Sequence, residues 1–495
     1  MKPLNAIIES PESINDSLKS INNSPKSINN SLKSINNSPK WIIKLKSSKI
    51  EPSAYFKPST YFKPSAYFKT WAGFLLASII LFGSFFAPTT ANACSSAIFS
   101  GKVTADGRPI IWKHRDTGQR NNRVEKYKGE KYNFIAIVNS NTKGKSIWSG
   151  TNDAGFSIMN TLSYNLNENK DFKRNNVGYV MYQALSKCAT LLEFEQLLDQ
   201  FNPLALEANI GVIDAQGGAA YYECSESGWI KFDVNDPKIA PLGYLEYTNH
   251  SFTGKFEQGM GYIRYNTAIS IINEALNTGK KITPEWVASN LSRSFRHSLL
   301  GIDLTQLFAK ELEEKSGNTS THKDNSSTWS NNSSTWSGYF IDQDFIPRLS
   351  STAVTIVQGV KPGENPELTV MYTILGYAPL GIAIPLMVNQ ELPTFMIASK
   401  GNENATMCDI VLAVKSKEIF NITRGNGQLY FNFKVLYNNY MKQIAPVEQE
   451  LFSEFNVLLD NWRNNNKTAN SNASKNKLTS IYTKAYTQFS EILTN

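Results

Sequence analysis

Short runs in which apolar and polar residues alternate mark the chain after residue 93. Such alternation is typical of strands, because successive side chains of a strand point to opposite faces of a sheet. Clusters of Gly, Asn and Lys separate the runs. The predicted strands are Ser96–Phe99, Pro109–Trp112, Tyr132–Val138, Ser146–Ser149 and Phe156–Met159, followed by a hairpin of Ile210–Asp214 and Ala219–Glu223.

The apolar spacing changes to a helical period further along the chain. A capping box at Thr190–Glu193 precedes one of these segments. Strand-like runs return at Thr352–Gln358 and Leu368–Leu375. This order of strands, helices and strands indicates a layered α+β domain. The predicted helices are Val177–Ser186, Phe194–Phe201, Gly261–Ala275, Pro284–Leu300, Ile302–Leu312, Val447–Trp462 and Leu478–Leu493.

The pattern also divides the chain into regions. Residues 1–70 hold short repeats with one Ile per seven residues or one Pro per six, which predicts disorder rather than a coiled coil or helix. One folded domain is expected over residues 94–445. A Ser/Asn/Thr tract at 316–338 is a predicted loop insertion within it, and residues 446–495 are a predicted C-terminal helical extension.

Residues 71–93 have the pattern of a secretory signal peptide. The uncharged run Trp71–Ala87 follows Lys63 and Lys69 and is closed by Ala91-Asn92-Ala93, a small-residue cleavage site. The run is slightly shorter than the ~20 residues of a membrane span. We therefore expect export to a periplasm or to the outside of the cell, with membrane contact only through this peptide or through a lipid anchor.

The charge excludes one class of partner. The whole chain carries +8, but the first 93 residues hold eleven lysines and four acidic residues, which leaves +1 for the remainder. A nearly neutral body lacks the basic footprint of a nucleic-acid-binding protein. No nucleic acid is expected as a partner, and the sequence gives no oligomeric state.

Cleavage after Ala93 would make Cys94 the first residue of the mature protein. A cysteine at a free N-terminus has its own base, because the α-amine titrates at about 7.7–8 and can take the thiol proton. Cys94 is therefore the predicted nucleophile. Two other interpretations stay open: acylation of Cys94 as a surface lipoprotein, and a Cys–His peptidase with His250 as the base.

Further candidates follow from what a thiol attack on an amide requires. Asn249 and Asn160 are candidate oxyanion donors, because neutral amides stabilise a developing oxyanion. Asp116, at the end of a predicted strand, is a candidate partner of the α-amine. Arg264 and Arg348 are candidates either for binding a substrate carboxylate or for pairing with Asp116.

No cofactor or metal is expected. The four histidines have no metal-ligand spacing and there is no glycine-rich phosphate loop. Of the four cysteines, Cys224 and Cys408 could form one disulfide after export, although a buried free thiol is the commoner state of such residues.

Several segments resemble the cysteine Ntn-hydrolases of the penicillin acyltransferase-like family, which is related to bile-salt hydrolases, penicillin V acylases and acid ceramidase. The resemblance spans roughly Cys94 to Gly376 with interruptions. It implies a four-layer αββα sandwich and cleavage or transfer at linear amides. The segments are Cys94–Gly107, Gly150–Phe156, Thr248-Asn249-His250 and Arg264-Tyr265.

Carried over from that family, Cys94 resembles the nucleophile, Asn249 the oxyanion-hole side chain and Asn160 a second site amide. Asp116 resembles the carboxylate near the amine and Arg264 the arginine after the oxyanion Asn. The family's Arg-Asn-x-Asp is replaced here by Lys113–Asp116, so Lys113 and Arg115 both remain candidates for the arginine's part.

The predicted function is an exported amidohydrolase or acyltransferase that cleaves a small-molecule N-acyl amide through a thioester. Tyr222-Glu223-Cys224 and Trp229 also resemble the Cys-type dipeptidases of the same superfamily, and that activity is the alternative. The acyl and amine specificities are not predicted.

Overall fold

The computed structural model describes residues 93–167, 173–309, 338–465 and 472–495. The predictions for residues 1–70, for the signal peptide up to residue 92 and for the insertion up to residue 337 lie outside the described residues. In the described part, no helix is long and apolar enough to cross a membrane.

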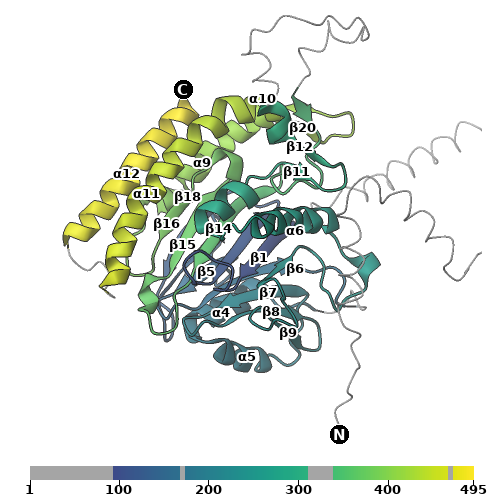
Figure 1. Ribbon diagram of the computed structural model, residues 1–495, viewed down its shortest axis with the longest axis vertical. Helices are drawn as coiled ribbons and strands as arrows, with labels where there is room; N and C mark the ends of the chain where they lie inside the picture. The colour runs from purple at the N-terminus through teal and green to yellow at the C-terminus, as the bar shows by residue number, and fades with distance from the viewer. Residues whose placement is uncertain (1–92, 168–172, 310–337, 466–471) are drawn as a thin grey trace, which may run out of the picture. The chain divides into compact units, whose positions relative to one another are not determined.

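A six-stranded antiparallel sheet carries the residue expected to be the nucleophile. Strand β1 (Ala93–Phe99) lies between β10 (Tyr244–Tyr247) and β2 (Ile110–Asp116). The sheet continues through β14 (Ser351–Gln358), β15 (Val370–Leu375) and β16 (Ile384–Leu386). Strands distant in the sequence are thus adjacent (Figure 1).

A seven-stranded sheet forms a simple antiparallel meander, in which each strand pairs with the next one along the chain. Its strands are β3 (Asn122–Tyr127), β4 (Phe134–Asn139), β5 (Ser149–Asn152), β6 (Ser157–Leu162), β7 (Ala208–Ile213), β8 (Ala219–Cys224) and β9 (Trp229–Asp233).

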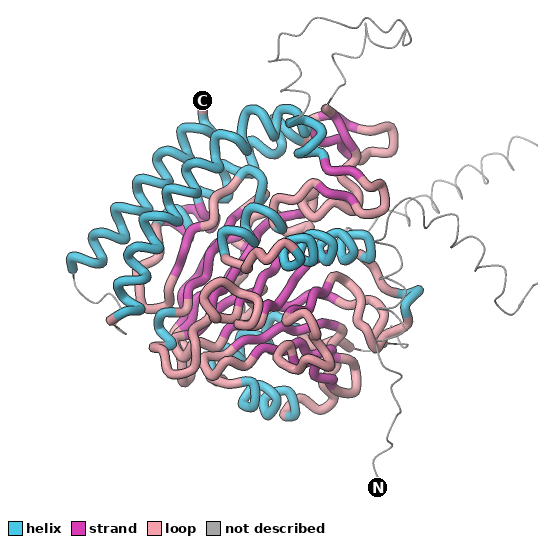
Figure 2. The backbone as a smooth tube through the Cα atoms, viewed as in Figure 1, coloured by secondary structure: helices cyan, strands magenta, loops and turns pink. Residues whose placement is uncertain are grey.

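The two sheets pack face to face between two helical layers (Figure 2). Helices α4 (Val177–Lys187) and α5 (Leu191–Asp199) cover the seven-stranded sheet. The other sheet is covered by α6 (Tyr262–Asn277), α9 (Thr406–Val414) and the short α7 (Pro284–Trp286). The predicted α+β class and four-layer αββα sandwich are confirmed.

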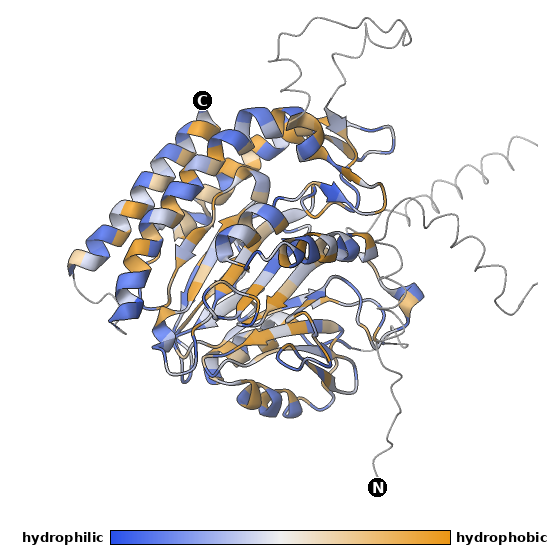
Figure 3. Cartoon of the chain, viewed as in Figure 1, coloured by the Kyte–Doolittle hydropathy of each residue, from blue (hydrophilic) through white to orange (hydrophobic). Residues whose placement is uncertain are grey.

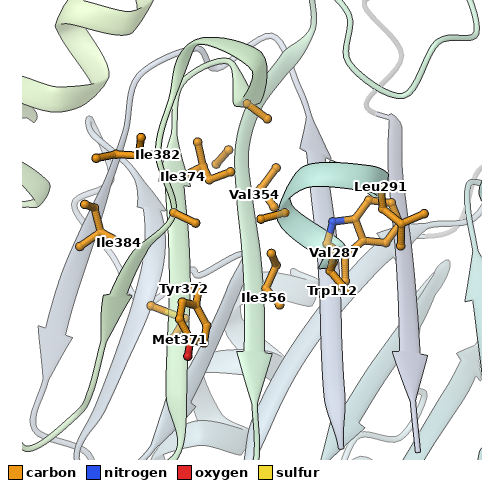
Figure 4. Packing of buried hydrophobic residues seen from close by; sticks show 14 of the residues in the cluster. Trp112, Val287, Leu291, Val354, Ile356, Met371, Tyr372, Ile374, Ile382 and Ile384 are labelled. Carbon is orange, nitrogen blue, oxygen red and sulfur yellow. The ribbon is translucent and has the colours of Figure 1, made fainter. Parts of the chain in front are cut away.

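The core beneath the helical layer is aliphatic and aromatic. Trp112 of β2 lies against Val287 and Leu291 of the helical turn η4 (Val287–Leu291) (Figure 4). Its indole nitrogen donates to Ser292 Oγ at 2.9 Å, so the buried N–H is satisfied. Burying each aliphatic side chain contributes about 1.5–3 kcal/mol, which makes this contact a main attachment of the helical layer to the sheet.

The C-terminal helices α11 (Lys442–Asn464) and α12 (Asn472–Thr494) form an antiparallel pair with apolar and polar residues alternating along both (Figure 3). Tyr486 of α12 stacks on Phe395 with ring centroids 4.2 Å apart. Helix α11 starts before residue 446, so the expected boundary there falls inside a helix. All described residues belong to one compact unit.

Some predicted bounds were wrong. The helix expected over Pro284–Leu300 ends at Leu291 and is followed by β11 (Arg296–His297). Just after this end, the Arg293 guanidinium donates to the carbonyls of Ala378 and Gly381 and pairs with Glu448, so tertiary contacts that the sequence pattern does not show take over there. The segment expected to be helical over Ile302–Leu312 begins as β12 (Ile302–Asp303) and is helical over 304–309, and its last three residues lie outside the described residues.

Smaller elements complete the described chain. They are η3 (Phe256–Gln258), β13 (Tyr339–Phe340), η5 (Pro366–Leu368), η6 (Ala378–Leu380), η7 (Thr394–Met396), β17 (Ala398–Ser399), β18 (Asn402–Ala405), η8 (Lys415–Ile419), β19 (Ile422–Thr423), β20 (Leu429–Asn432), α10 (Phe433–Val435) and η9 (Leu436–Met441).

Candidate active site

Cys94 is the second residue of β1 and is 7% exposed. Because side chains alternate along a strand, Cys94 and Ser96 share one face and Ser95 lies on the other. Ser96 Oγ is 2.9 Å from the hydroxyl of Tyr221 on β8, so the face with Cys94 is the one that meets the seven-stranded sheet. The Cys94 thiol therefore lies between the two sheets.

Asn249 directly contacts the backbone of Cys94. The Cys94 backbone N–H donates to Asn249 Oδ1 at 2.9 Å. The Asn249 Nδ2 group donates to the carbonyl of Leu162 at 2.7 Å, and the side chain is fully buried. With its oxygen bonded to the Cys94 N–H and one Nδ2 proton donated to Leu162, Asn249 retains a second Nδ2 proton as a candidate oxyanion donor.

Arg264 of α6 holds both Cys94 and Asn249 from the opposite face of β1. Its Nη1 donates to the Cys94 carbonyl at 2.7 Å and to Ser95 Oγ at 2.9 Å, and its Nη2 donates to Asn249 Oδ1 at 2.8 Å. These bonds leave little of the guanidinium for a substrate carboxylate. Burial lowers the pKa of Arg264 to about 10, so the side chain is a cation at neutral pH.

Gly261 allows this approach at the start of α6. Its φ is +83°, in the left-handed region that favours glycine, and a Cβ there would lie 2.4 Å from Arg264 Nη2 and 2.9 Å from Thr248 Cβ. A larger residue at position 261 would displace the arginine from Asn249.

Lys113 and Asn160 form the second part of the site. Lys113 Nζ donates to Asn160 Oδ1 and to the carbonyl of Trp148, both at 2.7 Å. Burial lowers the pKa of Lys113 to about 8, while the nearby Cys94 opposes that shift. The lysine thus supplies a buried positive charge close to the thiol and fixes the orientation of the Asn160 amide.

The Asn160 amide is oriented by the lysine at its oxygen. Since Lys113 holds Oδ1, the N–H bonds of Asn160 face away from the lysine. Asn160 is 5% exposed, so an oxyanion held there would be shielded from water. In a shielded site each such donor is stronger than in water.

Arg115 lies on the same face of β2 as Lys113 but has different partners. Its guanidinium donates to Asn122 Oδ1 at 2.5 Å and to Asn139 Oδ1 at 2.8 Å, and it packs 4.6 Å from the centre of the Trp148 ring. Lys113, and not Arg115, therefore contacts the Asn160 amide.

Asp116 lies on the opposite face of β2, which the helical layer covers. Its Oδ2 accepts from Arg348 Nε at 2.9 Å and Nη2 at 2.5 Å, and its Oδ1 accepts from Ser351 Oγ at 2.6 Å. Burial alone would raise the pKa of Asp116, but Arg348 and weaker cationic neighbours hold it below the ordinary value. Of the two roles expected for Arg348, the structure places it as the partner of Asp116.

Asp116 lies close enough in the sheet to contact an amine at residue 94, but other groups already occupy its carboxylate. Asp116 pairs in register with Ala93, directly before Cys94. Both carboxylate oxygens are, however, already bonded to Arg348 and Ser351. An amine at residue 94 would have to compete with those two groups.

His250 bonds elsewhere than to Cys94. Its Nδ1 lies 3.1 Å from Thr248 Oγ1 and 3.4 Å from the Met260 carbonyl, and its ring packs on Tyr262. Burial lowers the pKa of His250 to about 4, so the imidazole is neutral at neutral pH. These contacts give it no place as the base of a Cys–His pair.

The remaining cysteines carry no bridge, since Cys188, Cys224 and Cys408 are all buried free thiols and the disulfide considered between Cys224 and Cys408 is not formed. Across the described ranges, no three His, Cys, Asp or Glu residues lie together in a way that could hold a metal ion.

Tyr164 was not predicted from the sequence. Burial, and then the charge of Cys94, raises its pKa to about 12, which places the phenol close to the thiol. The residue follows β6 in a turn with no distinctive spacing, so the sequence offered no signal for it.

Together these groups can hold a thiol, a nitrogen and an oxyanion. Cys94 supplies both the sulfur and the nitrogen, Asn160 within β6 and Asn249 just after β10 supply amide N–H groups, and Lys113 supplies positive charge. This donor set suits attack of a thiolate on a carbonyl carbon.

Comparison with known proteins adds distant structural likeness only. No family model and no curated protein matches the chain. Solved structures with some likeness include a Caenorhabditis elegans N-acylethanolamine-hydrolyzing acid amidase ortholog, at 14% identity and a TM-score of 0.32 over 53% of this chain and 92% of that chain. At such values the likeness carries no weight for function.

Two further solved structures are similarly distant. A mutant of the conjugated bile acid hydrolase from Clostridium perfringens has 10% identity and a TM-score of 0.30, over 57% of this chain and 89% of that chain. The penicillin V acylase from Agrobacterium tumefaciens has 11% identity and a TM-score of 0.29, over 57% and 83%.

Proposed function

We propose that this protein is an exported N-terminal-nucleophile amidohydrolase that uses the Cys94 thiol to cleave a linear N-acyl amide. One observation supports this most directly: the Cys94 nitrogen, which cleavage after Ala93 would turn into an amine, donates to Asn249 Oδ1 at 2.9 Å. The nitrogen that would act as base and the amide that would bind the oxyanion are in contact.

The proposed reaction begins when the α-amine takes the thiol proton. The thiolate then attacks the amide carbonyl, and N–H groups of Asn249 and Asn160 stabilise the tetrahedral oxyanion. As the C–N bond breaks, the α-ammonium returns the proton to the leaving amine, which leaves an acyl thioester on Cys94. Water, deprotonated by the same amine, releases the carboxylic acid and restores the thiol.

Lys113 is the proposed electrostatic component of this reaction. Its ammonium group orients Asn160 through the 2.7 Å hydrogen bond to Oδ1. The same charge favours the thiolate over the thiol, because an opposite charge nearby stabilises an ionised group.

The burial of Cys94 argues for an enzyme over a surface lipoprotein. A diacylglyceryl group on the sulfur would have to occupy the space between the two sheets, where the residue is only 7% exposed. Acyl transfer to a second amine and cleavage of a dipeptide would use the same nucleophile, so they remain alternatives that substrates distinguish.

The test is turnover by protein whose first residue is Cys94. We expect release of p-nitroaniline from members of a panel of N-acyl p-nitroanilides, with a burst that reports the acyl-enzyme. Cys94→Ser is expected to lose turnover. In the wild-type protein, the trapped intermediate should add the acyl mass to the peptide that begins at Cys94.

A matched control comes from another buried free cysteine. Cys188→Ser changes a buried thiol directly after α4 that has no part in the proposed reaction, and this variant should retain turnover. Turnover that survives Cys94→Ser would refute the nucleophile, and turnover of dipeptides but not of acyl anilides would favour the dipeptidase alternative.

A further inference from the structure

The turn that follows Asn249 is attached to the inner face of the seven-stranded sheet by buried polar side chains. The main attachment is Glu223 of β8, which is 1% exposed. Its Oε1 accepts from the backbone N–H of Phe252 at 2.6 Å, and its Oε2 accepts from the N–H of Thr253 at 3.1 Å and from the Thr253 hydroxyl.

Glu223 also contacts the strand that leads into Asn249. The hydroxyl of Tyr247, on β10, donates to Glu223 Oε1 at 3.1 Å. One carboxylate therefore accepts bonds from both sides of Asn249, two residues before it and three to four residues after it.

Two asparagines extend this attachment. Asn209 pairs in register with Glu223 across β7 and β8, and its Nδ2 donates to the carbonyl of His250 at 2.9 Å. Asn165 accepts from the N–H of Ser251 at 2.8 Å and donates to its carbonyl at 3.0 Å. The backbone from His250 to Thr253 is thus fixed by side chains of β7, of β8 and of the loop after β6.

The position of this turn determines where the Asn249 amide lies relative to Cys94. Asn249 contacts both sheets, because its Oδ1 accepts from the Cys94 nitrogen of β1 at 2.9 Å and its Nδ2 donates to the Leu162 carbonyl of β6 at 2.7 Å. A misplacement of about 1 Å in such a site can cost about 100-fold in rate. Loss of one partner of buried backbone N–H groups leaves them unsatisfied, so the turn would shift to find water or other acceptors.

We propose that Glu223 is a positioning residue, which fixes the turn after Asn249 and thereby holds the Asn249 amide against Cys94. This inference rests on the proposed amidase function. Glu223 itself touches no reacting group; it acts through Asn249. The Tyr222-Glu223-Cys224 segment, which resembles a dipeptidase motif, thereby acquires a role in amide cleavage of either kind.

The test is Glu223→Gln in protein that begins at Cys94. Glutamine keeps the side-chain volume, but it replaces one accepting oxygen by an Nε2 donor, which would face a backbone N–H that is itself a donor. We expect kcat to fall about 10-fold to 100-fold, in line with a small displacement of the oxyanion donor, while KM stays within about twofold. Alkylation of Cys94 by iodoacetamide should continue, because the thiol and its amine remain.

Asp214→Asn is the matched control. Asp214 lies at the other end of the β7–β8 hairpin, is 3% exposed and likewise accepts backbone N–H bonds, from Leu191 at 2.9 Å, Gln216 at 3.0 Å and Gly218 at 2.8 Å. This variant should lower the unfolding midpoint and leave kcat per folded molecule unchanged. A loss of kcat equal in both variants would reduce Glu223 to a structural residue and overturn the inference.

Thr253→Val is the second variant, in case Glu223→Gln does not fold. It removes only the hydroxyl donor to Glu223, and we expect kcat to fall severalfold with KM unchanged; an unaltered kcat would overturn the role of Glu223. If the wild-type protein that begins at Cys94 cleaves none of the amides, by contrast, the proposed function itself is refuted.

Discussion

Asn249 supplies two different groups to the site, and a single substitution separates them. Asn249→Asp keeps an oxygen for the Cys94 nitrogen and for Arg264, but it removes the Nδ2 donor. We expect kcat to fall about 100-fold to 1000-fold, the usual cost of losing one oxyanion donor. Pre-steady-state acylation with a p-nitroanilide would measure the chemical step directly.

Asn152→Asp is the control for that substitution. Asn152 is also fully buried, and its Nδ2 donates to the carbonyls of Leu185 at 2.9 Å and Cys188 at 2.7 Å, remote from the thiol. It should lower stability and spare acylation. An acylation rate in Asn249→Asp no lower than in this control would exclude Asn249 from the oxyanion site.

Lys113 gives the reaction a testable pH dependence. Its pKa, lowered to about 8 by burial, means that the ammonium charge is lost as the pH rises through that value. The α-amine must be neutral to act as base, so activity rises toward its pKa of about 7.7–8. We expect a narrow bell-shaped profile of kcat/KM whose alkaline limb belongs to Lys113.

Lys113→Arg assigns the alkaline limb, because a guanidinium stays protonated in this range. The decline above about pH 8 should move to higher pH or disappear, and Lys113→Met should depress the whole profile. An alkaline limb that is identical in wild type and Lys113→Arg would show that some other group titrates there.

At the scale of the element, β2 holds four charged or titratable residues in a row, with two on each face. Lys113 and Arg115 meet the seven-stranded sheet, and His114 and Asp116 meet the helical layer. All four are buried, so each face must supply partners. On the helical side that partner is Arg348, which precedes β14.

Removing Arg348 should therefore destabilise the fold. Arg348→Met leaves the Asp116 carboxylate buried without its cation, which costs about 3–5 kcal/mol. Because the folded pKa of Asp116 is depressed, the pair contributes stability above the ordinary carboxyl pKa and loses it as the pH falls. The gap between wild type and variant in urea unfolding should thus be largest at neutral pH and narrow as the medium becomes acidic.

Arg296→Met provides the comparison on the same helical layer. Arg296 pairs with Glu274, which is 59% exposed, and with Asp303, which is 18% exposed, so losing these two partly solvated pairs should cost no more than about 1 kcal/mol each. The double variant Asp116→Asn with Arg348→Met should recover part of the lost stability. Equal losses for Arg348→Met and Arg296→Met would mean that Asp116 is not a buried charge.

The same strand shows where sequence patterns fail for elements. The predicted apolar run covered only Pro109–Trp112, with Asp116 placed at the end of the strand, and β2 does run from Ile110 to Asp116 with all four charged or titratable residues inside it. The charges are acceptable inside only because Asn160, Asn139 and Arg348 come from distant parts of the chain. No local pattern reports partners of that kind.

The site likewise contains some residues that the sequence pointed to and others that only the folded sheets bring together. Cys94 and Asn249 were candidates because a cleavage signal and a short motif mark them, and Arg264 was a candidate because it resembles the arginine after the oxyanion Asn of the related family. The choice between Lys113 and Arg115, the pairing of Asp116 with Arg348, and the buried Glu223 depend on strands that meet only in the folded sheets. The strands, the helices and the α+β class were predictable because strand and helix periods are regular, whereas the four-layer αββα arrangement was expected only from the family resemblance.

At the scale of the whole molecule, the sequence before Cys94 and the site have a chemical connection. The described chain keeps Ala93 in register with Asp116, with the Cys94 nitrogen still part of a peptide bond. An amide nitrogen cannot act as a base, whereas an amine in the same place can. Cleavage after Ala93 would therefore convert a folded but inactive site into an active one.

This is tested by two proteins that differ by one residue, one beginning at Cys94 and the other at Ala93. Both should fold alike, since Ala93 already lies in β1. Only the first should turn over amides, because the second has the same thiol but no amine on residue 94. Intact mass establishes each N-terminus, and the urea midpoint checks the fold. Equal turnover by the two proteins would show that the base is a side chain, with Lys113 a nearby group able to take the proton, and the α-amine would lose its role in the mechanism.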